Sequence, residues 1–155
     1  MKNIMFIVSA GLGVWILLAA AGCCQKCKEV ALCRLEQSAR VIRSSDVEAE
    51  KTEWGSLQWL VSANNKASEN ITLGRVTFKP GQANPPHFHP NCEEVLYVVS
   101  GAVEHTLPQG GTAILNAGDC IVLPKGSKHS AKNTGTEEAV VIVAFDSAYR
   151  QTQGE

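Results

Sequence analysis

The sequence predicts an all-β domain, built as a small barrel of short strands. Thirteen glycines and six prolines, most of them after residue 73, separate short runs rich in β-forming residues. Strands and turns alternate in this way in all-β barrels. Two histidines one residue apart, His87 and His89, also fit a strand, because side chains alternate with period two and both rings then face the same side.

The length and charge of the chain limit what this domain can be. It has 155 residues, of which 45% are hydrophobic and 19% are charged, and a formal net charge of −1. This length is enough for one domain with a single core. Nucleic-acid-binding domains usually carry a basic face, and the charge balance gives no sign of one. We therefore expect no nucleic acid as a partner.

Residues 1–22 form a hydrophobic segment that we interpret as a signal peptide or a membrane anchor. Lys2 precedes an uncharged run over residues 4–22, and the run ends in small residues before Cys23. This end resembles a bacterial lipobox, in which the cysteine is lipidated, although Ala20 stands where that motif usually has leucine. A cleaved signal and an uncleaved anchor remain as alternatives, since 19 uncharged residues are about enough to span a bilayer. Each interpretation places the domain outside the cytosol or tethers it to a membrane.

Residues 23–45 are predicted to be a cysteine-rich connector that joins this segment to the barrel domain at 46–155. Four of the six cysteines lie in it, namely Cys23, Cys24, Cys27 and Cys33. The Cys24-x-x-Cys27 pair would suit a redox or zinc site, but no second pair follows at zinc-ribbon spacing. Tether cysteines without chemistry are the favoured interpretation. A short amphipathic helix is expected over residues 25–43.

The strands of the barrel follow in order along the chain. They are predicted at residues 54–61, 71–78, 94–100, 102–107, 112–115, 119–123, 129–133 and 139–145. A turn is expected at Asn64 and Asn65. If Glu94 points into the barrel, alternation places Leu96 and Val98 on the same inner face.

Four residues sit at spacings that build a metal site with open positions: His87, His89, Glu94 and His129. After a turn at Pro90 and Asn91, the carboxylate of Glu94 can return alongside the two imidazoles. A third imidazole, from His129, follows a separate strand and turn. Three neutral nitrogens and one anionic oxygen suit a divalent transition metal ion better than calcium. We expect Mn, Fe or Zn, with Ni or Cu as further options.

The segments around these residues resemble the two motifs of the cupin superfamily. Residues 81–101 read Gly, five residues, His-x-His, four residues, Glu, six residues, Gly, and residues 118–133 read Gly, five residues, Pro-x-Gly, two residues, His, three residues, Asn. Sixteen residues separate the two motifs. The resemblance covers residues 70–145 and implies a double-stranded β-helix, or jelly-roll, barrel with a metal at its mouth.

The resemblance does not name a reaction, because cupins include oxygenases, decarboxylases, isomerases and binding modules. An enzyme that acts on an oxygen-rich small substrate is the favoured interpretation, since catalytic metal sites keep open positions. Glu94 and His129 are then the candidate catalytic residues. A non-catalytic module that anchors a small ligand or sugar on the metal is the alternative. Small one-domain cupins commonly pair, so we also expect a homodimer.

The remaining histidine, His105, has no partner in the sequence pattern. We expect it to be solvated or hydrogen-bonded. The walls around the metal are expected to be largely aliphatic, with few acid–base groups. Cys92, between two predicted ligands, is expected to be a packing residue.

Overall fold

The computed structural model describes residues 39–154, and the compact unit within them begins at Ile42. The predicted signal or anchor at 1–22, the four connector cysteines and most of the expected helix lie outside the described residues. Residues 39–43 have no regular secondary structure, and a 3₁₀ turn follows at Ser44–Asp46. No helix among residues 39–154 is long and apolar enough to cross a membrane.

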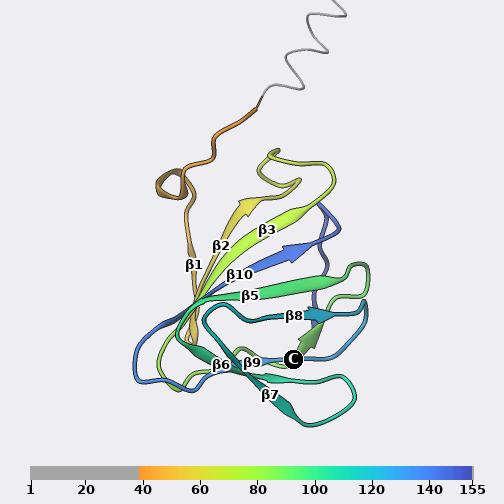
Figure 1. Cartoon of the computed structure of the whole chain (residues 1–155). Coiled ribbons are helices and arrows are strands. Elements are labelled where there is room, and N and C mark those ends of the chain that lie inside the picture. Colours follow the sequence, from red (N-terminus) through yellow and green to blue (C-terminus); the bar gives the residue numbers. More distant parts are fainter. Residues whose placement is uncertain (1–38, 155) are drawn as a thin grey trace, which may run out of the picture. The chain divides into compact units, whose positions relative to one another are not determined.

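Two facing sheets make up the barrel (Figure 1). The large sheet has the order β1-β2-β3-β10-β5-β8 and the small sheet the order β7-β6-β9, while β11 pairs with β4. The strands are β1 (Glu50–Lys51), β2 (Gly55–Val61), β3 (Thr72–Phe78), β4 (His87–Phe88), β5 (Glu94–Ser100), β6 (Ala102–Thr106), β7 (Thr112–Asn116), β8 (Cys120–Leu123), β9 (Ala131–Asn133), β10 (Ala139–Phe145) and β11 (Gln153–Gly154).

Alternation along β5 and β10 follows the predicted pattern. Glu94, Leu96 and Val98 are buried, whereas the intervening side chains of β5 are exposed. Along β10 every second residue from Ala139 to Phe145 is buried. The two strands are antiparallel neighbours, so their inner residues form one apolar layer of the core.

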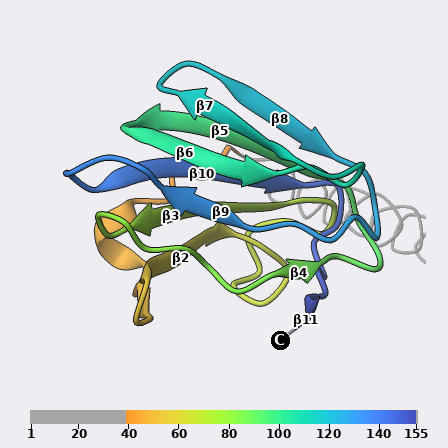
Figure 2. The same ribbon diagram turned by 90° about the horizontal axis from the view of Figure 1, so that it is seen from below.

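The small sheet lies across the inner face of the large one, as the view from below shows (Figure 2). Its central strand, β6, is paired with β7 on one edge and β9 on the other. Val103 and His105 therefore point to the same side, and both side chains are 0% exposed. Their burial places one face of β6 in the core.

The predicted fold class is confirmed: the described domain is an all-β jelly-roll barrel. The turn predicted at Asn64 and Asn65 is also present, with the Asn65 side chain accepting a hydrogen bond from the backbone N–H of Ser62 at 3.0 Å. Four strands are one residue shorter than predicted, and β9 differs most. β9 begins at Ala131, because His129 pairs with His87 in an isolated bridge and not with β6.

Candidate metal centre

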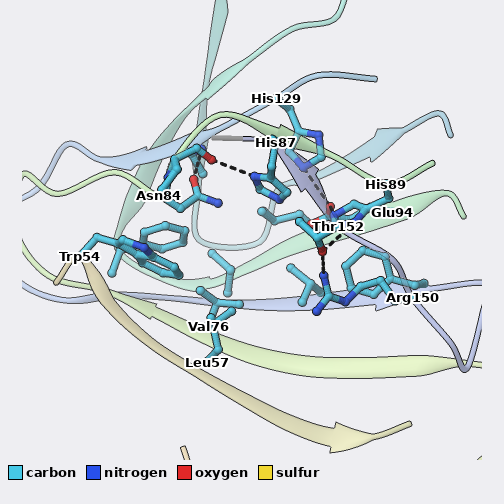
Figure 3. A pocket seen from close by; sticks show the side chains of 18 of the residues that line it. Trp54, Leu57, Val76, Asn84, His87, His89, Glu94, His129, Arg150 and Thr152 are labelled. Atoms are coloured by element: carbon cyan, nitrogen blue, oxygen red, sulfur yellow. Dashed lines mark hydrogen bonds and ion pairs between the residues drawn. The ribbon is translucent and has the colours of Figure 1, made fainter. Parts of the chain in front are cut away.

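The four predicted ligands come together at one end of the barrel interior (Figure 3). Each offers one ligand atom, and these atoms all lie within 4.8 Å of one another. His89, Glu94 and His129 are 3–5% exposed, and His87 is half-buried at the edge. Three separate parts of the chain contribute: the β4 region, the first residue of β5, and the loop before β9.

Backbone hydrogen bonds hold these three parts in register. The N–H of His87 donates to the carbonyl of His129 at 2.9 Å, and the reverse bond is 2.8 Å. The N–H of Gly126 donates to the carbonyl of His89 at 2.8 Å. Glu94 is paired on both sides, opposite Leu123 and Phe145. Strand or bridge pairing, which is more rigid than a loop, therefore positions His87, Glu94 and His129. His89 follows β4 and is held by the turn at Gly126.

Each imidazole of the cluster is oriented by a backbone carbonyl. Nδ1 of His87 bonds the carbonyl of Pro85 at 2.9 Å, Nδ1 of His89 that of Gln151 at 2.7 Å, and Nδ1 of His129 that of Ser127 at 2.8 Å. A carbonyl only accepts, so Nδ1 carries the proton in all three rings. In the neutral rings Nε2 is then an unprotonated acceptor, which is the form that binds a metal.

The centre of the cluster consequently contains acceptors without donors. Nε2 of His89 and Nε2 of His129 each lie 3.1 Å from Oε2 of Glu94. All three atoms are buried and have no well-aligned hydrogen-bond partner among the described residues. Buried polar atoms of this kind are rare and need an explanation. A cation bound between them satisfies all of these lone pairs together, so the residues fit a divalent transition metal ion.

The pKa shifts of His87 and Glu94 favour the forms that bind a cation, whereas the shift of His129 favours a proton that a cation must displace. Burial lowers the pKa of His87 to about 4, so this ring is neutral at pH 7. Burial opposes the charge on Glu94, but interactions with His129 and His89 outweigh it and lower the carboxyl pKa to about 2. Burial also opposes the charge on His129, and Glu94 outweighs it and raises the imidazole pKa.

A cavity of about 300 Å³ opens beside the cluster. The sequence predicted aliphatic walls, and this was wrong in part. Leu57, Val76 and Leu96 are present, but four aromatic side chains share the walls, namely Trp54, Trp59, Phe78 and Phe145. Four polar or charged residues that were not predicted also line it: Glu50, Asn84, Arg150 and Thr152.

The last described residues form part of this site. We call residues 149–154 the C-terminal strap. Gly154 of the strap pairs with His87, and the carbonyl of Gln151 holds His89. The Asn91 side chain fixes the strap from the opposite side, donating to the carbonyl of Tyr149 and accepting from the N–H of Gln151, both at 2.9 Å. No sequence pattern connects the strap with the site, because the connection exists only through this pairing.

His105 is buried next to the cluster, and not solvated. Its ring stacks on that of His129 with centroids 5.5 Å apart and planes 21° apart, and Nδ1 bonds the carbonyl of Thr106 at 2.7 Å. Burial lowers its pKa. The alternation of β6 with Val103 was the signal that predicts this burial. Cys92, in contrast, is a buried core residue as expected.

Residues 74–145 match the family model described as Cupin domain. Germin-like protein 5-1 of Oryza sativa subsp. japonica is 37% identical over 87 residues, which are 54% of this chain and 39% of that protein. Putative germin-like protein 3-4 of the same plant is 32% identical over 111 residues, which are 67% of this chain and 44% of that protein. The chain thus spans less than half the length of these curated relatives.

Solved structures share the fold of this domain. A variant of Bacillus subtilis oxalate decarboxylase superposes with a TM-score of 0.66 and 28% identity, over 72% of this chain and 31% of that chain. The polyketide cyclase RemF from Streptomyces resistomycificus has a TM-score of 0.64 and 22% identity, over 76% and 85%. The barrel is thus similar to the Cupin domain over residues 74–145, in sequence and in fold. The described domain is a single barrel with a His₃Glu candidate metal site.

Proposed function

We propose that the protein is a metal-dependent enzyme that acts on an oxygen-rich small molecule at His87, His89, Glu94 and His129. The observation that carries this proposal is the convergence of buried acceptors that have no donor among the described residues. Structural interactions normally pair an acceptor with a donor. A cluster in which each imidazole has turned its N–H outward to a carbonyl is suited to a cation in the middle.

One divalent ion, Mn, Fe or Zn, with Ni or Cu as further options, would supply Lewis-acid or oxygen-activating chemistry here. The protein residues have separate roles. The three imidazoles hold the ion as neutral ligands, and Glu94 gives the site its only anionic ligand. Four protein ligands leave open positions on an octahedral ion, where a substrate oxygen can bind. We propose Glu94 and His129 as the residues on which turnover depends most, because they are coupled at 3.1 Å deep in the site.

The similar proteins support an enzyme. Oxalate decarboxylase and oxalate oxidase, both named for reactions on a small oxygen-rich acid, share the fold with this chain. The oxalate decarboxylase of Bacillus subtilis is 28% identical over the shared region. An oxygenase, isomerase or lyase reaction is consistent with the site.

One observation favours a binding module as the alternative. Apart from the metal cluster, the cavity walls are mostly aromatic and aliphatic, and such side chains transfer no protons. Glu50 and His105 are the exceptions among the described ionisable residues that line it, with Arg150 permanently charged. A module that only binds a ligand through the metal needs no further residue that transfers protons.

The test is a turnover assay on metal-loaded protein. Protein loaded with Fe(II), Mn(II) or Zn(II) is incubated with small hydroxy acids, sugars and phenols, while oxygen uptake and product mass are followed. We expect product with at least one metal and loss of turnover in Glu94→Gln, because the amide carries no negative charge to tune the ion. Metal-dependent ligand binding without product under every condition would leave the binding module.

A further inference from the structure

Arg150 is the one permanently charged cation among the described residues that line the cavity. Its guanidinium carbon lies 4.2 Å from the centroid of the Trp59 ring and 5.2 Å from that of Phe145. The strap holds it there, and one guanidinium nitrogen donates to the hydroxyl of Thr152. The side chain is half-buried and faces the cavity from the His89 side (Figure 3).

Arg150 forms no ion pair with a carboxylate among residues 39–154. The charges of Glu94 and Glu50 act on it from beyond ion-pair distance. A guanidinium carries five N–H donors, and one hydroxyl acceptor leaves most of them unused. Burial lowers the pKa of Arg150, because the half-buried side chain is partly removed from water. A partly desolvated cation without a counter-ion in direct contact is costly, and an anion bound to it in the cavity relieves this cost.

The charge of the metal site would also favour an anionic ligand in the cavity. If the proposed function holds, a divalent ion contributes two positive charges and Glu94 removes one, so the cluster keeps one positive charge beside Arg150. An anionic ligand then faces two positive groups, against the single carboxylate of Glu50 on the lining. Carboxylates match the planar fork of arginine, and the resulting bonds are about twice as strong as neutral ones.

The apolar side chains in the rest of the cavity favour a ligand whose main part is apolar. Trp54, Leu57 and Val76 lie across the cavity from Arg150 (Figure 3), and Phe78 lines it as well. The volume of about 300 Å³ lies at the small end of ligand sites. A small diacid would leave these apolar walls in contact with water, whereas a ring-sized apolar group covers them.

We propose that the cavity binds a monocarboxylate with a ring-sized apolar body, with its carboxylate on Arg150 and its body against Trp54, Leu57 and Val76. This inference names the substrate class of the same site and rests on the proposed function for the metal's share of the charge. Arg150 is then the residue that selects acids over neutral molecules. The strap that carries it is preorganised by Asn91, so little ordering is needed on binding.

The test compares three probes by titration calorimetry on the native protein, with and without metal: phenylacetate, its neutral isostere phenylacetamide, and oxalate. We expect phenylacetate to bind at least about tenfold more tightly than the amide, because the amide loses a charge-assisted pair. Part of this preference persists without metal, since Arg150 is still present. Oxalate is expected to bind more weakly than phenylacetate.

Substitutions at Arg150 test whether this residue causes the preference for the acid over the amide. Arg150→Met should bind the acid and the amide within about threefold of each other, and Arg150→Lys should keep part of the preference, because a point charge remains. Arg75→Met is the matched control, since Arg75 is exposed on β3 and does not line the cavity. If Arg150→Met does not fold, the acid-to-amide ratio of the native protein and of Arg150→Lys decides.

Three results would overturn the inference: no binding of phenylacetate, equal binding of acid and amide by the native protein, or an unchanged preference in Arg150→Met. Oxalate binding as tightly as phenylacetate would overturn the apolar-body part. Metal analysis on the same samples separates this outcome from failure of the proposed function. A metal-loaded protein without acid preference refutes only the role of Arg150, whereas a protein that takes up no metal refutes the proposed metal site.

Discussion

At the scale of single residues, the candidate site depends on which imidazole nitrogen carries the proton. The carbonyls of Pro85, Gln151 and Ser127 decide this for the three cluster histidines. The spacing of the four residues in the sequence is enough to predict them as metal ligands. In particular, a strand places His87 and His89 on one face. The spacing does not predict the outer hydrogen bonds, since the acceptors lie on loops that alternation does not describe.

Metal affinity should fall as the pH is lowered through the titration of His129. In the metal-free protein Glu94 raises the pKa of this imidazole above its ordinary value of 6.5. Below that raised pKa the ring is protonated, and the ion must displace the proton. The logarithm of the affinity should therefore change by about one per pH unit there. Competitive chelator titrations from pH 5.5 to 8 measure this slope. A metal affinity that does not change with pH over that range would contradict the link between His129 protonation and metal binding.

The metal-free protein should lose stability as the pH falls from about 6.5 toward 4. Burial holds the pKa of His87 at about 4 in the folded protein, whereas the unfolded ring titrates near 6.5. Between these values the unfolded state binds the extra proton, so the free energy of unfolding decreases as pH falls. His87→Gln should flatten this slope in chelator-treated samples. Thermal melts at several pH values measure this dependence of stability on pH. An equal slope in the native protein and in His87→Gln would refute the assignment of the effect to His87.

At the scale of elements, strands that alternate strongly were the easiest to predict. The inner faces of β5 and β10 follow from the period-two pattern alone. The remaining parts of the site come from short segments whose place depends on distant pairing. Arg150 follows the last long strand and reaches the cavity only because β11 pairs with β4. Glu50 and Asn84 likewise lie outside the predicted strands, so periodicity carries no information about them.

Asn91→Ala should weaken metal binding more than it weakens the fold. The side chain fixes the strap through Tyr149 and Gln151, and Gln151 in turn orients His89. Loss of such an outer contact typically costs 10- to 100-fold in metal affinity. Asn64→Ala is a suitable control, because Asn64 is an exposed turn residue that does not line the metal cavity. Affinities and melting temperatures of both variants should be compared, and equal affinities would contradict the role of the strap.

Gly55→Ala should destabilise the domain far more than Gly81→Ala. A Cβ at Gly55 would overlap the backbone carbonyl of Thr77 on the neighbouring strand β3. Gly81 has a φ of +71° but open space around it, so alanine there costs only backbone strain of about 1–2 kcal/mol. We expect at least about 3 kcal/mol at Gly55, since backbone must move. Urea unfolding of both variants tests the order, and similar losses would contradict the close packing of β2 on β3.

At the scale of the whole molecule, the outer face of the large sheet offers a surface for self-association. Val95, Tyr97, Val99 and Val122 are exposed there at 36–53%. Val95 and Val122 are cross-strand partners, so the apolar side chains are adjacent. Contiguous exposed apolar groups mark interaction sites. We predict a homodimer formed by this sheet, in which Tyr97→Lys is monomeric and the control Lys132→Ala on β9 remains dimeric. Light scattering at micromolar concentration decides, and a monomeric native protein would refute it.

The N-terminal segment gives a second prediction at this scale. We propose that the protein is exported or tethered to a membrane through residues 1–22, with Cys23 as a lipidated N-terminus. Cys23→Ser should then accumulate as an unprocessed precursor, whereas Cys120→Ser, in the barrel, should be processed normally. Mass spectrometry of membrane extracts measures both. An intact segment 1–22 in the native protein would contradict lipidation and favour an uncleaved anchor.

The most direct test of the central claim is the metal content of the purified native protein and its histidine variants. By elemental analysis we expect about one divalent transition ion per chain, on the ligand count of a single site. His87→Ala and His129→Ala should lose most of the ion while remaining folded. His105→Gln should retain it, because this fourth histidine lies outside the ligand cluster. Full occupancy in both His87→Ala and His129→Ala would contradict the metal site described here.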